Sequence, residues 1–217
     1  MAAERPPRTA SRPGRPMALS AAAGFAAGGV AQLLALGGES VRPVGTGLAP
    51  WLTVGFIVTI VAARRLTGPQ RLPWTCIVAA AYLYAWLFAY HLLYRVVQSP
   101  PTATVWAESR LWVAAVAPGC VALGCLAVGS LRSGAVGDAC AAASLAWSLP
   151  EAVAAMHDGM FHGLAFALPV LLLAVVPPAV ARGRRCDPAI VACAGLLGGA
   201  ALALALPPLL RVLNHVG

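Results

Sequence analysis

The most unusual reactive side chain in this sequence is the carboxyl group of Glu151. It lies in AVGDACAAASLAWSLPEAVAAM, an apolar stretch long enough to cross a membrane. An ionised carboxylate in such a place is costly unless it is paired, hydrated or protonated. A carboxylic acid kept away from water can act as a proton donor, a proton relay or an ion site. Glu151 is therefore the first candidate catalytic residue.

Two further candidates for acid–base chemistry are expected near Glu151. His91 precedes Arg95 by one helical turn in another apolar segment, and Asp158 lies two turns after Glu151 on the same small, polar helix face. An ion pair with Arg95 would make Glu151 a link between two helices. A place beside His91 and aromatic rings would make it a proton donor. The sequence leaves both alternatives open.

The segment WTCIVAAAYLYAWLFAYHLLYR is rich in aromatic residues. Electron-rich rings deep in a membrane suit an apolar ligand and stabilise a cation through their quadrupoles. Rings near the end of such a segment are also typical of the belt at the membrane–water interface. The predicted substrate-binding residues are Tyr84, Trp86, Phe88, Tyr90, Tyr94 and Arg95, with Trp147 from the segment that holds Glu151.

Other kinds of site have weaker support. HDGMFH, residues 157–162, could bind a divalent metal together with Glu151, but an Asp-Gly turn between two helices explains it more simply. The six cysteines show no metal-ligand spacing, so neither a metal nor a cofactor is predicted. All 15 basic residues are arginine, and the absence of lysine excludes a retinal Schiff base and a phosphate-loop lysine.

Composition and patterning indicate a polytopic membrane protein. Of the 217 residues, 60% are hydrophobic and only 10% are charged, and the apolar residues occur in long blocks. The expected fold is all-α, a membrane bundle of about seven transmembrane helices in one domain, residues 17–217. An Arg/Pro-rich tail, residues 1–16, is expected to be disordered. The predicted helices cover residues 17–36, 48–63, 74–97, 111–131, 135–156, 160–181 and 189–213.

Two features of these segments bear on assembly and orientation. Gly24 and Gly28, like Gly195 and Gly199, have the GxxxG spacing that lets helix backbones approach closely and permits a homo-oligomer. With alternating helices, eleven arginines lie on the side of the N-terminus and four on the other, which predicts a cytoplasmic N-terminus. This distribution also explains the net charge of +8 without a nucleic-acid partner. The predicted partners are the lipid bilayer of the cell membrane and a lipophilic small molecule.

Several stretches carry a family resemblance: the Gly-rich first segment, WLTVGFIVTIVA, the aromatic third segment, APGCVALGCLAVGSLR and SLPEAV. In these the chain resembles a family of small actinobacterial multi-pass membrane proteins of unknown function, the DUF6518-like proteins. That resemblance implies a fold and no activity. The architecture is also similar to that of the seven-helix membrane terpene cyclases, which use intramembrane acids on isoprenoid chains, and this similarity is an analogy.

Three functions fit these features. The favoured one is a membrane enzyme that acts on a lipophilic, isoprenoid-type substrate by acid catalysis, such as a terpene cyclase, with Glu151, His91 and Asp158 as catalytic residues. One alternative is a small-solute permease or a substrate-binding transport component, because interrupted helices with polar residues at depth are common in transporters. The other is a structural or assembly protein without catalysis.

Overall fold

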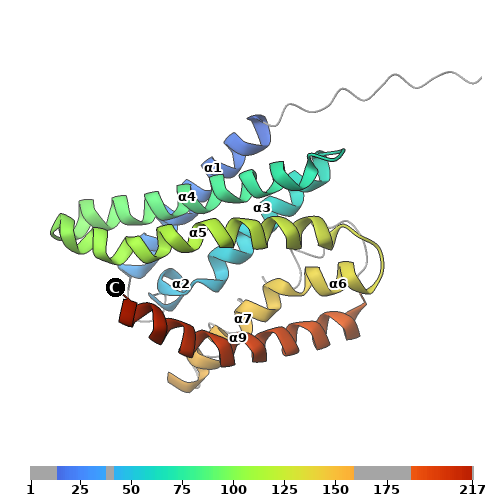
Figure 1. Ribbon diagram of the computed structural model, residues 1–217. Helices are drawn as coiled ribbons and strands as arrows, with labels where there is room; N and C mark the ends of the chain where they lie inside the picture. Colours follow the sequence, from blue (N-terminus) through green and yellow to red (C-terminus); the bar gives the residue numbers. More distant parts are fainter. Residues whose placement is uncertain (1–13, 38–41, 159–186, 217) are drawn as a thin grey trace, which may run out of the picture.

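The computed structural model describes residues 14–37, 42–158 and 187–216. Figure 1 shows that these residues form a layered bundle of helices. The helices are α1 (Gly14–Ala35), α2 (Arg42–Thr46), α3 (Ala49–Arg65), α4 (Arg71–Gln98), α5 (Thr102–Ser130), α6 (Ala135–Ala141), α7 (Ala143–Asp158) and α9 (Pro188–Val216). None of the described residues forms a β-strand, so the predicted all-α class is confirmed for them.

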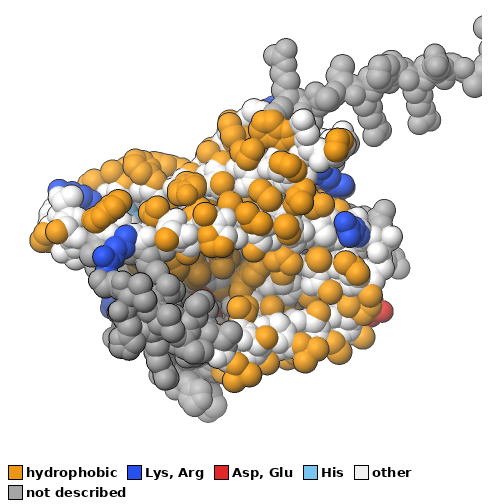
Figure 2. Space-filling view, viewed as in Figure 1, with side chains coloured by type: hydrophobic (Ala, Val, Ile, Leu, Met, Phe, Trp, Pro, Cys, Tyr) orange, Lys and Arg blue, Asp and Glu red, His pale blue; other side chains and the backbone are white. Residues whose placement is uncertain are grey.

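Among the described helices, three are long and apolar enough to cross a membrane: α1, α4 and the part of α5 from Trp112 to Ser130. The stretch Pro188–Leu204 of α9 is a shorter apolar helix. Figure 2 shows apolar side chains over the middle of the visible face and arginines near the ends of the helices. A water-soluble protein rarely exposes so continuous an apolar surface, so the structure supports a membrane protein. The segment predicted at residues 160–181 lies outside the described residues.

Two predicted helix boundaries were wrong. The segment 135–156 is not one helix, because α6 and α7 are separated at Ala142. The carbonyl oxygen of Ala142 accepts hydrogen bonds from the N–H groups of Leu145, at 3.0 Å, and Ala146, at 3.1 Å, so the turn is tightened there. Helix α5 begins at Thr102 rather than at residue 111. Its first turns contain Glu108 and Arg110, whose charges hide this part of the helix from a hydropathy pattern.

Among the described helices, α1 and α4 make the most extensive contact, and their backbones approach each other closely. Gly24 and Gly28 are buried on the face of α1 that meets α4. A Cβ atom at Gly24 would collide with the backbone carbonyl of Tyr82, and one at Gly28 with that of Trp86. The GxxxG prediction is confirmed here, since only a hydrogen atom fits between the two backbones.

The second GxxxG pair joins α9 to α7. A Cβ atom at Gly195 would collide with the side chain of Leu145, and one at Gly199 would lie 3.2 Å from the carbonyl oxygen of Ala146. Pro150 has no amide hydrogen, so it leaves this carbonyl without its usual partner one turn along α7. Gly199 therefore lets α9 approach α7 where Pro150 interrupts the hydrogen bonds of that helix.

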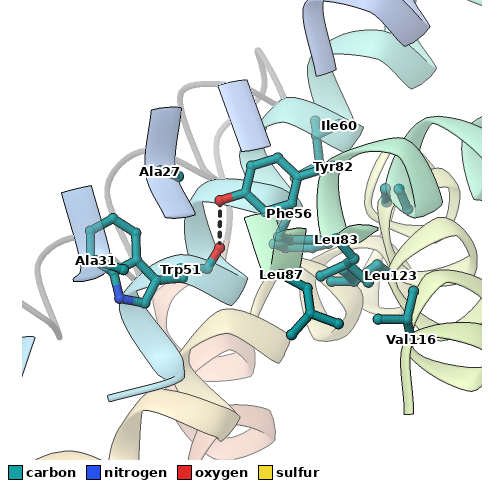
Figure 3. Close-up of a cluster of buried hydrophobic side chains, with 12 residues drawn as sticks. Ala27, Ala31, Trp51, Phe56, Ile60, Tyr82, Leu83, Leu87, Val116 and Leu123 are labelled. Atoms are coloured by element: carbon teal, nitrogen blue, oxygen red, sulfur yellow. Dashed lines mark hydrogen bonds between the residues drawn. The ribbon is translucent and has the colours of Figure 1, made fainter. Parts of the chain in front are cut away.

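Helix α3 crosses the bundle and contacts α1, α4, α5 and α7. The fully buried ring of Tyr82 packs against it, and the hydroxyl group of Tyr82 donates a hydrogen bond of 3.0 Å to the carbonyl oxygen of Trp51 (Figure 3). Gly55 makes room for this ring, because a Cβ atom at residue 55 would lie 2.6 Å from Cε1 of Tyr82. The buried cluster around this contact comprises Ala27, Ala31, Trp51, Phe56, Ile60, Ala79, Tyr82, Leu83, Leu87, Val116, Leu123 and Ala127.

The packing of α1 on α4 predicts a difference between two neighbouring glycines. Gly28→Ala places a methyl group on the carbonyl of Trp86 and should lower the free energy of unfolding by about 1–3 kcal/mol. Gly29→Ala is the matched control, because its Cβ atom would meet only Cδ1 of Leu93, at 3.5 Å. Thermal unfolding of the purified protein in detergent measures both. Equal stability of the two variants would contradict this packing.

Candidate functional site

The carboxylate of Glu151, in α7, lies at the first turn of α3. Its Oε1 atom accepts hydrogen bonds from the backbone N–H groups of Leu48, at 2.8 Å, and Ala49, at 3.0 Å. Its Oε2 atom accepts a second bond from the N–H group of Ala49, also at 3.0 Å. Both carboxylate oxygens act as acceptors, which suits the ionised form of the group. Glu151 is thus a cap on a helix about a hundred residues away in sequence.

The local sequence of α3 explains why the helix needs this cap. The first amide groups of a helix have no partner within the helix, and their dipoles attract an anion. Leu48, the residue before α3, has an apolar side chain and makes no side-chain cap. Pro50 follows in the first turn and has no amide hydrogen at all. Glu151 supplies from another helix the acceptor that these residues lack.

Trp147 makes a second link between α7 and α3, one turn before Glu151. Its Nε1 atom donates a hydrogen bond of 3.0 Å to Oγ1 of Thr53. Its ring packs edge-on against Phe56, with ring centroids 5.5 Å apart and an interplanar angle of 84°. Because Trp147 pairs with Thr53 and Glu151 with Ala49, the two helices meet in antiparallel register. Trp147, a predicted substrate-binding residue, packs here between the helices.

The face of α7 that carries Glu151 points into the bundle, as the sequence predicted. Ser144 and Ser148 on this face are fully buried. The side chain of Asp158, the third predicted catalytic residue, lies outside the described part of the structure, as do those of residues 157 and 160–162 in the candidate metal patch. Their predicted roles therefore stay predictions.

The ion pair between Glu151 and Arg95, one of the two alternatives that the sequence left open, is not formed within the described structure. Arg95 lies near the end of α4, and its guanidinium group donates a hydrogen bond to Oγ1 of Thr102 at the start of α5. Arg95 thus stabilises the turn between α4 and α5, whereas Glu151 is held at the start of α3. Opposite charge alone suggested a bond between Glu151 and Arg95. Instead, Glu151 bonds to backbone N–H groups at the start of α3, and Arg95 bonds to Thr102.

A second acid also lies at the start of a helix. Asp138 in α6 is buried, and its Oδ2 atom accepts a hydrogen bond of 3.2 Å from the backbone N–H group of Asp187, the residue before α9. Asp187 caps α9 itself, through a bond of 2.9 Å from the N–H group of Ala189 to its own Oδ1 atom. The two acids of the segment 135–156 therefore both connect to helix starts elsewhere in the chain.

A small cavity, which we call the inner cavity, lies between the start of α3 and α4. It has a volume of about 90 Å³ and is lined by Gly45, Thr46, Gly47, Leu48, Trp86, Leu87, Tyr90, His91 and Trp112. The rings of Trp86 and Tyr90 stack, with centroids 5.8 Å apart, and the ring of His91 packs edge-on against Tyr90 at 5.5 Å. The Nε1 atom of Trp86 is buried and has no hydrogen-bond partner among the described residues.

A larger hollow, which we call the outer groove, lies between α4 and α5. Its volume is about 420 Å³, and it is lined by Tyr84, Leu87, Phe88, His91, Leu92, Arg95, Val105, Ser109 and Val113. The side chains of Tyr84 and Phe88 are 46% and 61% exposed, so their rings are accessible from outside the bundle. The groove is mainly apolar and leads along α4 to Arg95.

The predicted ligand-binding residues of α4 therefore divide between two hollows. Tyr84, Phe88 and Arg95 line the outer groove, and Trp86 and Tyr90 line the inner cavity. His91 lines both, and so does Leu87, which sequence reasoning missed because an apolar residue in an apolar helix carries no signal. Sequence reasoning also missed Trp112, an aromatic residue that lines the inner cavity. Because Trp112 belongs to α5, only the pairing of α4 with α5 could have predicted its place in this wall.

Three predicted site residues line neither hollow within the described structure: Glu151, Trp147 and Tyr94. Leu48 links Glu151 to the inner cavity indirectly. Its backbone N–H group binds Glu151, and the same residue lines the cavity.

No known protein family, curated protein or solved structure matches this chain.

The cap on α3 predicts the result of changing Glu151. Glu151→Gln removes the charge and replaces one acceptor oxygen by an NH₂ group, so one N–H group of the helix start faces another donor. The free energy of unfolding should fall by about 1–3 kcal/mol. Unfolding in detergent measures this, with Val153→Ala as a control on the exposed face of the same helix. A Gln variant as stable as the wild type would contradict the cap.

Proposed function

We propose that this chain is a multi-pass membrane protein that binds a lipophilic, isoprenoid-type molecule in the outer groove. The observation that carries this proposal is the composition of the groove. The exposed rings of Tyr84 and Phe88 form an apolar wall, and Arg95 lies at the end near the turn between α4 and α5. Such a strip suits a ligand with a long apolar chain and one polar end.

The length of the groove supports a membrane-embedded ligand. Tyr84 and Arg95 are separated along α4 by about 16 Å, because a helix rises about 1.5 Å per residue. This is roughly one leaflet of a bilayer whose hydrocarbon core is ~30 Å thick. An arginine near the end of a spanning helix places its charge at the membrane–water interface. The apolar chain would then lie between Arg95 and the middle of the membrane.

The geometry supports binding more strongly than acid catalysis by Glu151. An acid that starts a reaction must touch the reacting atoms, and Glu151 lines neither hollow. Both its oxygens are occupied by amide groups of α3. If the protein is an enzyme, His91 is the candidate acid–base residue beside the ligand, because it lines both the groove and the cavity.

We also propose seven membrane spans with a cytoplasmic N-terminus. The described helices support this orientation. The start of α1, the end of α3, the start of α4 and the end of α5 lie at one end of the bundle (Figure 1). These are the helix ends that carry Arg15, Arg64, Arg65, Arg71 and Arg132. An excess of arginine at one end is typical of the cytoplasmic side.

Reporter fusions test this orientation in bacterial cells. Alkaline phosphatase is active only outside the cytoplasm. Green fluorescent protein fluoresces in the cytoplasm but not when it is exported in the unfolded state. A fusion after Ser99, in the turn between α4 and α5, should give phosphatase activity and no fluorescence. A fusion after Ser133, beyond α5, should give fluorescence and no phosphatase activity. The opposite pair of results would overturn the orientation.

Ligand binding in the groove predicts an effect of Phe88. With the protein in phosphatidylcholine nanodiscs, radiolabelled farnesol should bind saturably, one molecule per chain. Phe88→Ala should weaken this binding about tenfold, since a lost aromatic contact of about 1.4 kcal/mol corresponds to that factor. Val96→Ala is the matched control, because Val96 is an exposed apolar residue of α4 that does not line the groove. Equal affinity in both variants would contradict the proposed site.

A further inference from the structure

We infer that an anionic phospholipid binds in a cleft between α1 and α3, with one acyl chain in the cleft and the phosphate group beside Arg65. This hollow, which we call the α1–α3 cleft, has a volume of about 230 Å³. It is lined by one face of α1, from Pro16 to Ala23, and by one face of α3, from Ile57 to Arg65. None of its lining residues lines the outer groove or the inner cavity, so this site is independent of the ligand proposed for the groove.

The walls of the α1–α3 cleft are mainly apolar and open to the outside of the bundle. Leu19 on one wall is 54% exposed, and Val61 on the other is 39% exposed. Ser20, the polar residue of the α1 wall, is fully buried, and its hydroxyl group donates a hydrogen bond of 2.8 Å to the carbonyl oxygen of Val78 in α4. Because this donor is already used, the walls present mainly hydrocarbon to a ligand and suit an acyl chain.

One end of the α1–α3 cleft carries an excess of positive charge. Arg65 is the last residue of α3, lines the cleft and is exposed. Arg64 precedes it, and Arg15 lies in the first turn of α1, at the same end of the bundle (Figure 1). Residues 14–23 and 57–71, which form the cleft and the turn after it, contain four arginines and no aspartate or glutamate. Such an end attracts the phosphate group of an anionic lipid, to which a guanidinium group donates two parallel hydrogen bonds.

The length of the α1–α3 cleft fits a lipid better than a free anion. Ile57 and Arg65 are separated along α3 by about 12 Å, because a helix rises about 1.5 Å per residue. One leaflet of the hydrocarbon core is about 15 Å thick, so a lipid with its phosphate beside Arg65 would lay most of one acyl chain along these walls. A free phosphate ion would contact only the charged end and would leave the apolar walls uncovered.

Photochemical labelling of the full-length protein tests this site. A phosphatidylglycerol probe with a diazirine group in the middle of one acyl chain is added to phosphatidylcholine nanodiscs, and the labelled residues are identified by mass spectrometry. The probe should label the residues of α1 and α3 that line the cleft. An excess of unlabelled phosphatidylglycerol should suppress this labelling, and the same excess of phosphatidylcholine should not.

A matched pair of variants tests the role of Arg65. Arg65→Gln should weaken binding of the phosphatidylglycerol probe at the cleft about fivefold, which is the effect of one arginine near an anionic lipid. Labelling by the corresponding phosphatidylcholine probe should stay the same. Arg132→Gln is the control, because Arg132 is an exposed arginine just beyond α5 that does not line the cleft. Equal effects of the two substitutions would overturn the head-group site.

The wild-type protein alone decides the question if Arg65→Gln does not fold. Labelling that is the same with both lipid probes and spread over the exposed faces of α4 and α5 would show that the cleft holds only bulk lipid, and would overturn the inference. An unlabelled cleft in a protein that native mass spectrometry shows to be a dimer would assign the cleft to a second copy of the chain, and would overturn it equally. Neither result changes the expected binding of farnesol in the outer groove, since the two sites share no lining residue.

Discussion

The bond between the carboxylate of Glu151 and the first amide groups of α3 is the contact on which the arrangement of this bundle depends. Helix α3 crosses the molecule between α1, α4, α5 and α7, so the position of its start determines where the rest of the core packs. From that start, the carbonyl oxygen of Trp51 accepts a bond from Tyr82 in α4, and the indole of Trp51 donates to the carbonyl oxygen of Val44 in α2, at 3.0 Å. A helix start without its own cap is costly inside a membrane, where water is absent. One remote carboxylate removes that cost and joins α7 to the start of α3.

The same contact relates the buried acid to the candidate site. Leu48 gives its N–H group to Glu151 and forms part of the wall of the inner cavity, so the acid shapes this cavity without entering it. The two faces of α4 line different hollows. One face presents Tyr84, Phe88 and Arg95 to the outer groove, and the other presents Trp86 and Tyr90 to the cavity.

Much of the architecture could be predicted from the sequence, because apolar blocks and GxxxG pairs are local patterns. The partner of Glu151 could not, because backbone amide groups occur at every residue and carry no sequence signal. The visible candidates were side chains of opposite charge, and Arg95 was the nearest of these in the predicted topology. The signal that existed lay in α3, where apolar Leu48 and Pro50 leave a helix start without a local cap. The division at Ala142 was equally hidden, because alanine favours helices and carries no signal for a break, whereas α5 and α7 continue through Pro118 and Pro150.

Hydrogen exchange of the amide groups of Leu48 and Ala49 tests the central claim most directly. If the carboxylate of Glu151 holds these two groups, they should exchange slowly in the wild-type protein, as the interior amides of α3 do. In Glu151→Ala, the amide groups of Leu48 and Ala49 should exchange much faster than the interior amides of α3. Without the carboxylate, the start of α3 can open locally, and this opening exposes these two groups alone. Rapid exchange of both amides in the wild type, or slow exchange that is the same in the variant, would contradict the account.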